Sequence, residues 1–464
     1  MREALANANR FLHRKKEKEV EILDLKNLTF RGGVHPDGNK DLSNQAPITR
    51  AKEPALVSIS MHQHTGAPCE PTVQVGDTVK IGQIIGNTEA FVSAPIHASI
   101  SGTVKEITTI TTPTGMKTKA VVIENDGREE LGYIEMDRKL EDLSADELKK
   151  IVRDAGITGL GGASFPAHVK FAPPADKPID SVIINGSECE PYLTADQLTM
   201  QTWPEKIIRA LEAILKILGA PNGYIVIEDN KPEAIKVMQD AAAGHANIQV
   251  AALKTKYPQG DEKRVIDVVL NRQVPSGGLP MDVGAVVSNV STAIAVHDAV
   301  YRNKPLYERV ITLTGHALAE PKNLIVKMGT PLEELIEQAG GFRETPGKII
   351  SGGPMMGMAQ PTLHTFTIKG MGGLLVLTEE EAKKPKTSNC INCARCVEAC
   401  PVRLEPLQIE RAVNALDFDR AEAYRPLDCI ECGACSYTCP AKRPLVEAIR
   451  LAKYEIRAKM QKAR

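Results

Sequence analysis

Eight of the ten cysteines of this chain lie between residues 390 and 439, and their spacing restricts the fold of that region more than any other feature. They form two runs of one pattern, Cys-x2-Cys-x2-Cys-x3-Cys-Pro. The first run holds Cys390, Cys393, Cys396 and Cys400, and the second holds Cys429, Cys432, Cys435 and Cys439. Because this spacing bends a short loop so that successive thiolates converge on one cubane, the pattern predicts two [4Fe–4S] clusters.

The fourth cysteine of each run binds the other cluster in two-cluster ferredoxins. We therefore expect one cluster on Cys390, Cys393, Cys396 and Cys439, and the other on Cys429, Cys432, Cys435 and Cys400. Structural zinc is the alternative, but a zinc site would use four cysteines in two pairs. Cys69 and Cys189 remain, and a buried inert thiol is the expectation for each.

Thiolates that bind metal must stay reduced, so this cysteine usage predicts a cytosolic compartment rather than a disulfide scaffold. Two neighbouring clusters carry single electrons. We therefore expect the rest of the chain to hold a two-electron group, for which flavin is the usual choice.

The length of 464 residues predicts several domains, and 42% hydrophobic with 25% charged residues is typical of a globular protein. The formal net charge of -1 gives no support for nucleic acid as a partner, and we expect none. No segment has the roughly 18–20 apolar residues of a membrane-spanning helix. Residues 1–25 are charged, which predicts a solvated helix or extension rather than a secretory signal.

The predicted fold is multidomain, with α/β and α+β parts. Residues 1–54 form an N-terminal extension and a loop segment that contains TFRGGVHP. At 55–130, short β-type runs between glycine turns resemble the two halves of a biotinyl/lipoyl-like barrel. Carriers of that family present a modified lysine on the central hairpin, whereas residues 87–92 read NTEAFV here. We therefore expect a scaffold barrel.

Residues 140–305 alternate between helix and strand patterns, which predicts a Rossmann-like, mostly parallel sheet with ligands at the carboxyl ends of its strands. Residues 306–380 predict a small β-grasp (SLBB-like) module, and 385–445 a two-cluster ferredoxin-like α-helical domain. A basic helix is predicted at 446–464, with one face formed by Leu445, Ile449, Ala452, Ile456 and Met460. Two interpretations stay open for it: docking on a partner or an anionic membrane, and packing as a terminal helix.

A glycine-rich loop, GITGLGGASFPAHVKF, runs from Gly156 to Phe171 directly after a predicted helix. Glycines let backbone N–H groups approach a phosphate or a flavin ring, and a following lysine adds a positive charge. A tight turn is the simpler interpretation. The spacing matches neither the Rossmann GxGxxG pattern nor a Walker A loop.

Within this loop, GLGGASFPAHVKF resembles the GRGGAGFPxGxKW flavin loop of the NADH-oxidising flavoprotein subunit of respiratory complex I. Segments 185–191, 260–263 and 288–292 resemble that family's NADEGEP, GEET and NNVET in the same order, with serine at 164, 187 and 288 as departures. The resemblance implies that FMN is bound by Gly159, Gly161, Gly162, Phe165, Lys170, Asn185, Asn289 and Thr292. It also implies that Glu188, Glu190 and Glu262 are catalytic residues lining the flavin and nicotinamide pocket.

The order of all these segments resembles that in the RnfC family of the Rnf electron-transport complex over nearly all of residues 27–445. The resemblance implies a peripheral subunit at the cytoplasmic face of the cell membrane, in an ion-translocating ferredoxin:NAD oxidoreductase. It implies an enzyme that exchanges hydride between NAD(H) and FMN and relays single electrons through two [4Fe–4S] clusters. Iron–sulfur and integral membrane subunits would be its partners, with ferredoxin as an indirect one.

Two other functions are compatible with parts of this pattern. The cobalamin reductase of propanediol-utilisation microcompartments shares the barrel, flavin and two-cluster plan, although TFRGGVHP favours the Rnf family. A non-catalytic electron-transfer adaptor would keep the clusters and a vestigial flavin site, although the intact glycine loop with Lys170 argues against it.

Overall fold

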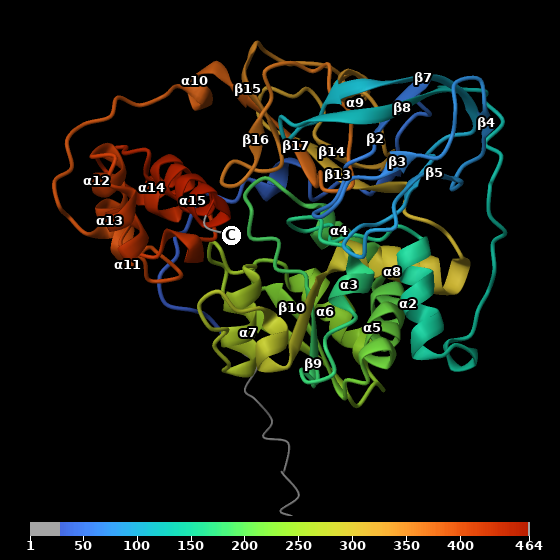
Figure 1. Cartoon of the computed structure of the whole chain (residues 1–464), viewed down its shortest axis with the longest axis horizontal. Helices are drawn as coiled ribbons and strands as arrows, with labels where there is room; N and C mark the ends of the chain where they lie inside the picture. The colour runs from blue at the N-terminus through green and yellow to red at the C-terminus, as the bar shows by residue number, and fades with distance from the viewer. Residues whose placement is uncertain (1–27, 463–464) are drawn as a thin grey trace, which may run out of the picture.

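The computed structural model describes residues 28–462, and the extension predicted at 1–25 lies outside them. The described chain forms a barrel of two small sheets, a parallel sheet covered by helices, a mixed sheet and a helical C-terminal part. The C-terminal helices lie to one side of the other three parts (Figure 1). No helix within residues 28–462 has the length and apolar character needed to cross a membrane.

The barrel consists of two antiparallel sheets. The first has the order β2 (Leu56–Ser60), β8 (Lys117–Asn125), β7 (Gly102–Thr111) and β4 (Thr78–Val79). The second has the order β3 (Glu70–Pro71), β5 (Ile84–Asn87) and β6 (Ile96–His97). Fully buried aliphatic residues from both sheets, such as Ile59, Ile85 and Ile123, form its core. The hairpin predicted without a carrier lysine follows β5.

The sheet predicted for residues 140–305 is parallel throughout. Its order is β11 (Ile248–Leu253), β10 (Asn222–Glu228), β9 (Ser181–Asn185) and β12 (Ala285–Asn289). The helices α2 (Ala145–Asp154), α5 (Pro204–Leu218), α6 (Pro232–Ala242) and α8 (Val290–Arg302) contribute to the hydrophobic core on one face. The helix α7 (Glu262–Leu270) packs on the other face. Asn185 and Asn289 therefore end neighbouring strands at the same edge.

Local signals set the ends of these helices. Ser144 begins α2 with a capping box, since it accepts from the Glu147 N–H while Glu147 accepts from Ser144. Gly219 ends α5 in the left-handed region, with φ 63°. The helix α6 begins with Pro232 at its first position and ends at Ala242.

The mixed sheet follows the order β1 (Thr49–Arg50), β14 (Lys322–Lys327), β13 (Glu308–Thr314), β17 (Gly373–Thr378), β15 (Pro346–Ser351) and β16 (Met358–Ala359). The helix α9 (Leu332–Gln338) packs on it through Leu332, Leu335 and Ile336. The edge strand β1 comes from the predicted N-terminal loop segment, so that segment is built into the fold.

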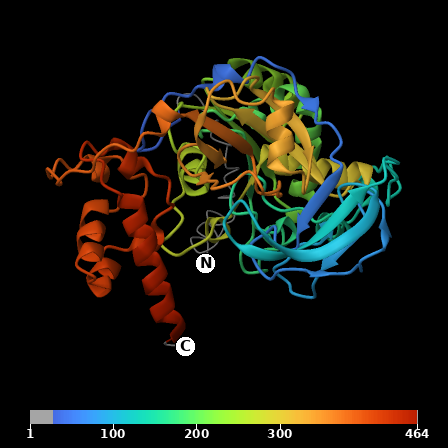
Figure 2. The same ribbon diagram turned by 90° about the horizontal axis from the view of Figure 1, so that it is seen from above.

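The C-terminal part contains α11 (Arg395–Glu398), α12 (Pro406–Asn414), α13 (Phe418–Ala423), α14 (Ala434–Thr438) and α15 (Leu445–Lys462). The helix α15 packs on α12 and α13 (Figure 2). Four of the five residues predicted on its apolar face are buried: Leu445, Ile449, Ala452 and Ile456. Met460 is 47% exposed, one turn beyond the packed region. The apolar face of this helix therefore packs inside the C-terminal part, as the second interpretation expects.

The segment 28–34, here called the N-terminal strap, connects the parallel sheet to the C-terminal part. Leu28 pairs with Leu253 at the open edge of β11. Further along, the Gly33 N–H donates to the Ala399 carbonyl at 2.8 Å, and Val34 pairs with Tyr257. The glycines of TFRGGVHP therefore lie between the two parts of the molecule.

Candidate functional site

Each predicted set of four cysteines lines one cavity of the C-terminal part. The first cavity, here called the inner cavity, is lined by Cys400, Cys429, Cys432 and Cys435. The second, here called the outer cavity, is lined by Cys390, Cys393, Cys396 and Cys439. In both cavities the fourth cysteine comes from the other run. The fold therefore groups the thiols in the crossed arrangement.

The two cysteine loops have matching backbones. Asn392 and Glu431 occupy the same position in their runs, and both are left-handed, with φ 57° and 58°. The N–H of Asn392 points to Cys390 Sγ at 3.4 Å, and the N–H of Glu431 points to Cys429 Sγ at 3.3 Å. Backbone donors aimed at sulfur stabilise the negative charge of a cluster.

A cluster fits these cavities better than a single ion does. Zinc binds sulfur at about 2.3 Å, so its ligands must converge on a point. Within residues 28–462, no three His, Cys, Asp or Glu side chains are arranged to hold one metal ion. Burial raises the pKa of Cys432 to about 12, and the positive charge of bound iron would favour the thiolate at this position.

The two cavities differ in their surroundings. Around the inner cavity, the Tyr257 hydroxyl donates to the Cys432 carbonyl at 2.7 Å, and Ser276 donates to Asp428 at 2.6 and 2.8 Å. At the outer cavity, Cys393 is exposed and Ile391 is 67% exposed. The inner cavity thus faces the parallel-sheet part, whereas the outer cavity opens to solvent.

The glycine-rich loop lies where the barrel, the parallel sheet and the mixed sheet meet. Its carbonyl groups are held from outside the loop. Lys369 Nζ donates to the Gly156 carbonyl at 2.6 Å, and the Arg309 guanidinium donates to the Leu160 carbonyl at 3.1 Å. Thr65 of the barrel donates through Oγ1 to the Ala163 carbonyl at 2.6 Å.

Both cations are buried, and no carboxylate of residues 28–462 forms a hydrogen bond with either. Burial lowers the pKa of Lys369 to about 7 and that of Arg309 to about 10. Both come from the mixed sheet part, and no feature of the sequence pattern marked them.

Fewer of the N–H groups than of the carbonyl groups of this loop form hydrogen bonds with the rest of the described chain. The Leu160 N–H donates to Thr292 Oγ1 at 2.9 Å, whereas those of residues 161–163 donate to no protein atom within the described chain. A Cβ at Gly161 would lie 2.8 Å from the Asn289 side chain, whereas at Gly162 it would meet open space. The loop therefore presents free donors beside the ends of β9 and β12, which fits the phosphate or ring of a flavin.

Of four other predicted residues, Phe165 and Lys170 belong to this loop, and Asn185 and Glu262 come from other segments. Asn185 Nδ2 donates to the Gly260 carbonyl at 2.8 Å. Lys170, at the end of the short helix α3 (Ala167–Lys170), pairs with Glu262 at 2.6 Å. Phe165 accepts from the Gly159 N–H through its carbonyl at 2.8 Å. Lys170 and Glu262 are partly exposed, so this pair is accessible to a ligand.

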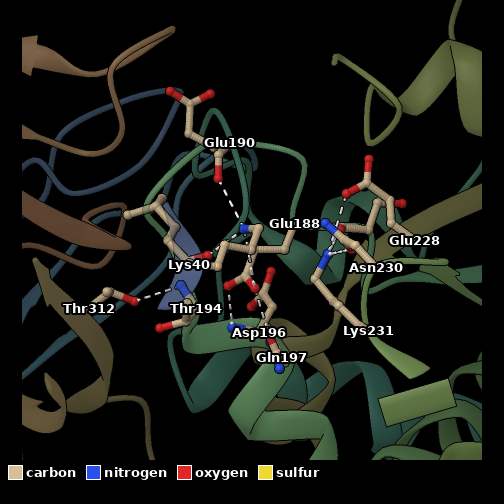
Figure 3. A network of polar contacts seen from close by, with 12 residues as sticks. Lys40, Glu188, Glu190, Thr194, Asp196, Gln197, Glu228, Asn230, Lys231 and Thr312 are labelled. Atoms are coloured by element: carbon tan, nitrogen blue, oxygen red, sulfur yellow. Dashed lines mark hydrogen bonds and ion pairs between the residues drawn. The ribbon is translucent and has the colours of Figure 1, made fainter. Parts of the chain in front are cut away.

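Glu188 belongs to a buried network instead (Figure 3). Its carboxylate accepts from the N–H groups of Asp196 (2.6 Å) and Gln197 (3.2 Å), at the start of α4 (Ala195–Thr202). Lys40 Nζ lies 3.9 Å away, and the Glu188 side chain is 4% exposed. Burial raises the pKa of Glu188 to about 7. Its backbone is left-handed, with φ 47°, which turns the side chain toward α4.

Glu190 contacts the loop after β15. Its carboxylate accepts from the N–H groups of Met355 (2.7 Å) and Met356 (3.0 Å), and burial raises its pKa. Its carbonyl accepts from Lys40 Nζ at 3.2 Å. Of the three glutamates expected in one pocket, only Glu262 directly contacts another of the predicted site residues.

Comparison with known families matches each part of the chain. The RnfC barrel sandwich hybrid domain matches residues 28–128, and the Nuo51 FMN-binding domain matches 152–298. The SLBB domain matches 310–359, and the 4Fe-4S dicluster domain matches 382–440.

Three relatives, all RnfC-type subunits, match over most of their length. That of the proton-translocating ferredoxin:NAD(+) oxidoreductase complex of Clostridium ljungdahlii is 51% identical, covering 93% of this chain and 94% of that protein. That of the Na(+)-translocating complex of Acetobacterium woodii is 46% identical, covering 95% and 100%. That of the ion-translocating oxidoreductase complex of Rhodobacter capsulatus is 39% identical, covering 92% and 83%.

Proposed function

This chain belongs to the RnfC family of ion-translocating ferredoxin:NAD oxidoreductase complexes, and from this premise we propose that it is the NAD(H)-binding flavo-iron–sulfur subunit of such a complex. Its substrate is NAD(H), and its cofactors are FMN and two [4Fe–4S] clusters. Its partners are the iron–sulfur and membrane subunits of the complex, and ferredoxin indirectly.

The observation that carries this proposal is the short connection between the glycine loop and the inner cavity. Residues 257–260 contact both places: Tyr257 donates to Cys432, and Gly260 accepts from Asn185. A group bound at the glycine loop and a cluster in the inner cavity would thus share one wall. Such an arrangement supports electron transfer between them.

The roles of the individual residues follow from their contacts. FMN bound at this site would exchange a hydride with NAD(H) and single electrons with the clusters. Residues 161–163 offer N–H donors to it, and Lys170 offers a charge for its phosphate. Asn289, which caps the start of α8, packs against Gly161, and Thr292 in the first turn of α8 accepts from the Leu160 N–H. We place Glu262 beside the nicotinamide. Glu188 and Glu190 instead hold neighbouring backbone in place, because they accept from the N–H groups of Asp196 and Met355.

The same proposal extends to the finer organisation. The domains run from 55 to 130, 140 to 305, 306 to 380 and 385 to 445, preceded by residues 1–54 and followed by the helix 446–464. The mixed sheet with α9 is proposed as a β-grasp fold, and the parallel sheet as Rossmann-like. We place the protein at the cytoplasmic face of the membrane, where reduced thiols are stable.

An anaerobic absorbance spectrum with iron and flavin quantitation tests the function. We expect about one flavin and eight irons per chain, with loss of visible absorbance when NADH is added. Protein with iron but no flavin that fails to reduce ferricyanide with NADH would instead be a non-catalytic electron-transfer adaptor.

A further inference from the structure

The inner cavity is held against the parallel-sheet part by a buried tyrosine. Tyr257 is 1% exposed, and its hydroxyl donates to the carbonyl of Cys432 at 2.7 Å. The tyrosine ring packs in a hydrophobic cluster with Val34, Ala399 and Ala434. No other hydroxyl group from outside residues 382–462 donates to the backbone of a cysteine in the described chain.

The N-terminal strap fixes the backbone of this tyrosine. Val34 and Tyr257 exchange two N–H to carbonyl bonds, at 2.8 and 2.9 Å. Lys256 Nζ donates to the Phe30 carbonyl at 2.9 Å, and its charge lies 4.8 Å from the centre of the Phe30 ring. The strap and the segment at Tyr257 thus form one paired unit.

Two glycines allow the strap to pass this closely. At Gly33 φ is +80°, and a Cβ would lie 2.7 Å from the Tyr257 carbonyl oxygen. At Gly32 φ is +92°, and a Cβ would lie 2.9 Å from the carbonyl oxygen of Cys400. Any side chain here would push the strap away from both the tyrosine and the inner cavity.

We propose that Tyr257 is a positioning residue for the inner cluster, the one expected on Cys400, Cys429, Cys432 and Cys435, and that the glycines of the strap keep it in place. Its hydroxyl dipole is aimed at the backbone of a cluster ligand in a buried site. The hydroxyl proton offsets part of the negative charge of the Cys432 carbonyl beside the cavity, which favours the reduced, more negative state of a cluster bound there. The tyrosine therefore acts through Cys432, both on the potential of the inner cluster and on its distance from the glycine loop.

Tyr257→Phe removes only the hydroxyl and is the first test. Dithionite titration followed by EPR reads each cluster without NADH or flavin, so it does not depend on the proposed function. Cys400→Ser and Cys439→Ser identify which signal belongs to the inner and which to the outer cluster. We expect the equilibrium constant for reduction of the inner cluster alone to fall about two- to fivefold. This change corresponds to a fraction of the free energy of one hydrogen bond. This corresponds to roughly 20 to 40 mV at 59 mV per tenfold.

Tyr454→Phe is the matched control, because this tyrosine lies on α15 with 69% exposure. It should leave both signals at their wild-type potentials. Iron content in Tyr257→Phe should stay at eight per chain.

A second pair of variants separates close contact from backbone strain. Gly33→Ala and Gly115→Ala both place alanine at φ +80°, but Gly115 has no atom within 4 Å of the added Cβ. We expect Gly33→Ala to shift the inner signal and to slow reduction of the clusters by NADH, whereas Gly115→Ala should do neither.

Three outcomes would overturn the proposal. They are an unchanged inner signal in both Tyr257→Phe and Gly33→Ala, an equal shift of both clusters, and the same shift in Gly115→Ala. If wild-type protein is not reduced by NADH, the proposed function fails, while the dithionite titration still decides the role of Tyr257.

Discussion

The ion pair between Lys170 and Glu262 should compete directly with FMN. The Nζ–Oε1 distance is 2.6 Å, and the two side chains are 31% and 38% exposed. A pair this exposed contributes about 0.2–1 kcal/mol. Once a phosphate binds nearby, Lys170 gains a charge-assisted hydrogen bond of about 1.5–3 kcal/mol. The net gain from Lys170 is therefore about 0.5–2.8 kcal/mol.

These values predict opposite effects for the two residues. Lys170→Ala should weaken FMN binding by roughly 2- to 100-fold, with 1.4 kcal/mol taken as tenfold. Glu262→Gln should strengthen it by about 1.5- to 5-fold, because the lysine no longer has to leave a carboxylate. In the double variant, affinity should equal that of Lys170→Ala, since the glutamate then has nothing to compete for.

The assay is an anaerobic FMN titration of flavin-depleted protein, followed by quenching of flavin fluorescence, with iron content measured in parallel. Lys177→Ala is the matched control, because Lys177 and Asp282 form a comparable pair at 2.5 Å in the same part of the chain. Weaker FMN binding in Glu262→Gln, or equal loss of iron and FMN in Lys170→Ala, would refute the reasoning.

Three further predictions concern other parts of the site. Cys439→Ser should damage the cluster nominally built by Cys390, Cys393 and Cys396, and EPR showing loss of only the other cluster would contradict the crossed assignment. Lys369→Met leaves the Gly156 carbonyl buried without its donor, so FMN should dissociate several-fold faster in stopped-flow experiments at unchanged iron content. Burial raises the pKa of Glu188 from 4.5 to about 7, so between these pH values the folded state binds a proton that the unfolded state has lost. The contribution of Glu188 to stability therefore falls as the pH rises from about 4.5 to about 7. The melting temperature of Glu188→Gln relative to wild type should therefore rise between pH 5 and 8, and a constant difference would argue against it.

The grouping of the cysteines around two cavities agrees with the expectation from local spacing, while their assignment as cluster ligands stays a prediction. The cysteine runs fix their own loops, and pairing each fourth cysteine with the other run follows from the near-repeat of one pattern. The parallel arrangement of the sheet was also predictable, because strands that alternate with helices form parallel sheets. The pairing of β9 with β12, which brings Asn185 beside Asn289, was not, since β10 and β11 lie between them in the sequence.

What the sequence did not reveal depends on contacts between distant segments. Arg309 holds a carbonyl 149 positions earlier, and Lys369 one 213 positions earlier. The local sequence around either residue predicts an exposed cation in a strand or a loop. Glu188 shows the converse limit, because its left-handed backbone turns a glutamate expected in the pocket toward α4. Only the tertiary structure decides on which side of a loop such a side chain lies.

The burial of the two cavities orders the electron path. Tyr257 and the strap contact the backbone of cysteines that line the inner cavity, so a cluster there would lie on the side of a flavin bound at the glycine loop. The outer cavity has an exposed Cys393 and an exposed Ile391 at its rim, so a cluster there is accessible to another protein of the complex. Each cavity also takes one cysteine from the other run. With the clusters bound as predicted, this crossed arrangement would tie a cluster beside the proposed flavin site to a cluster that is open to a partner.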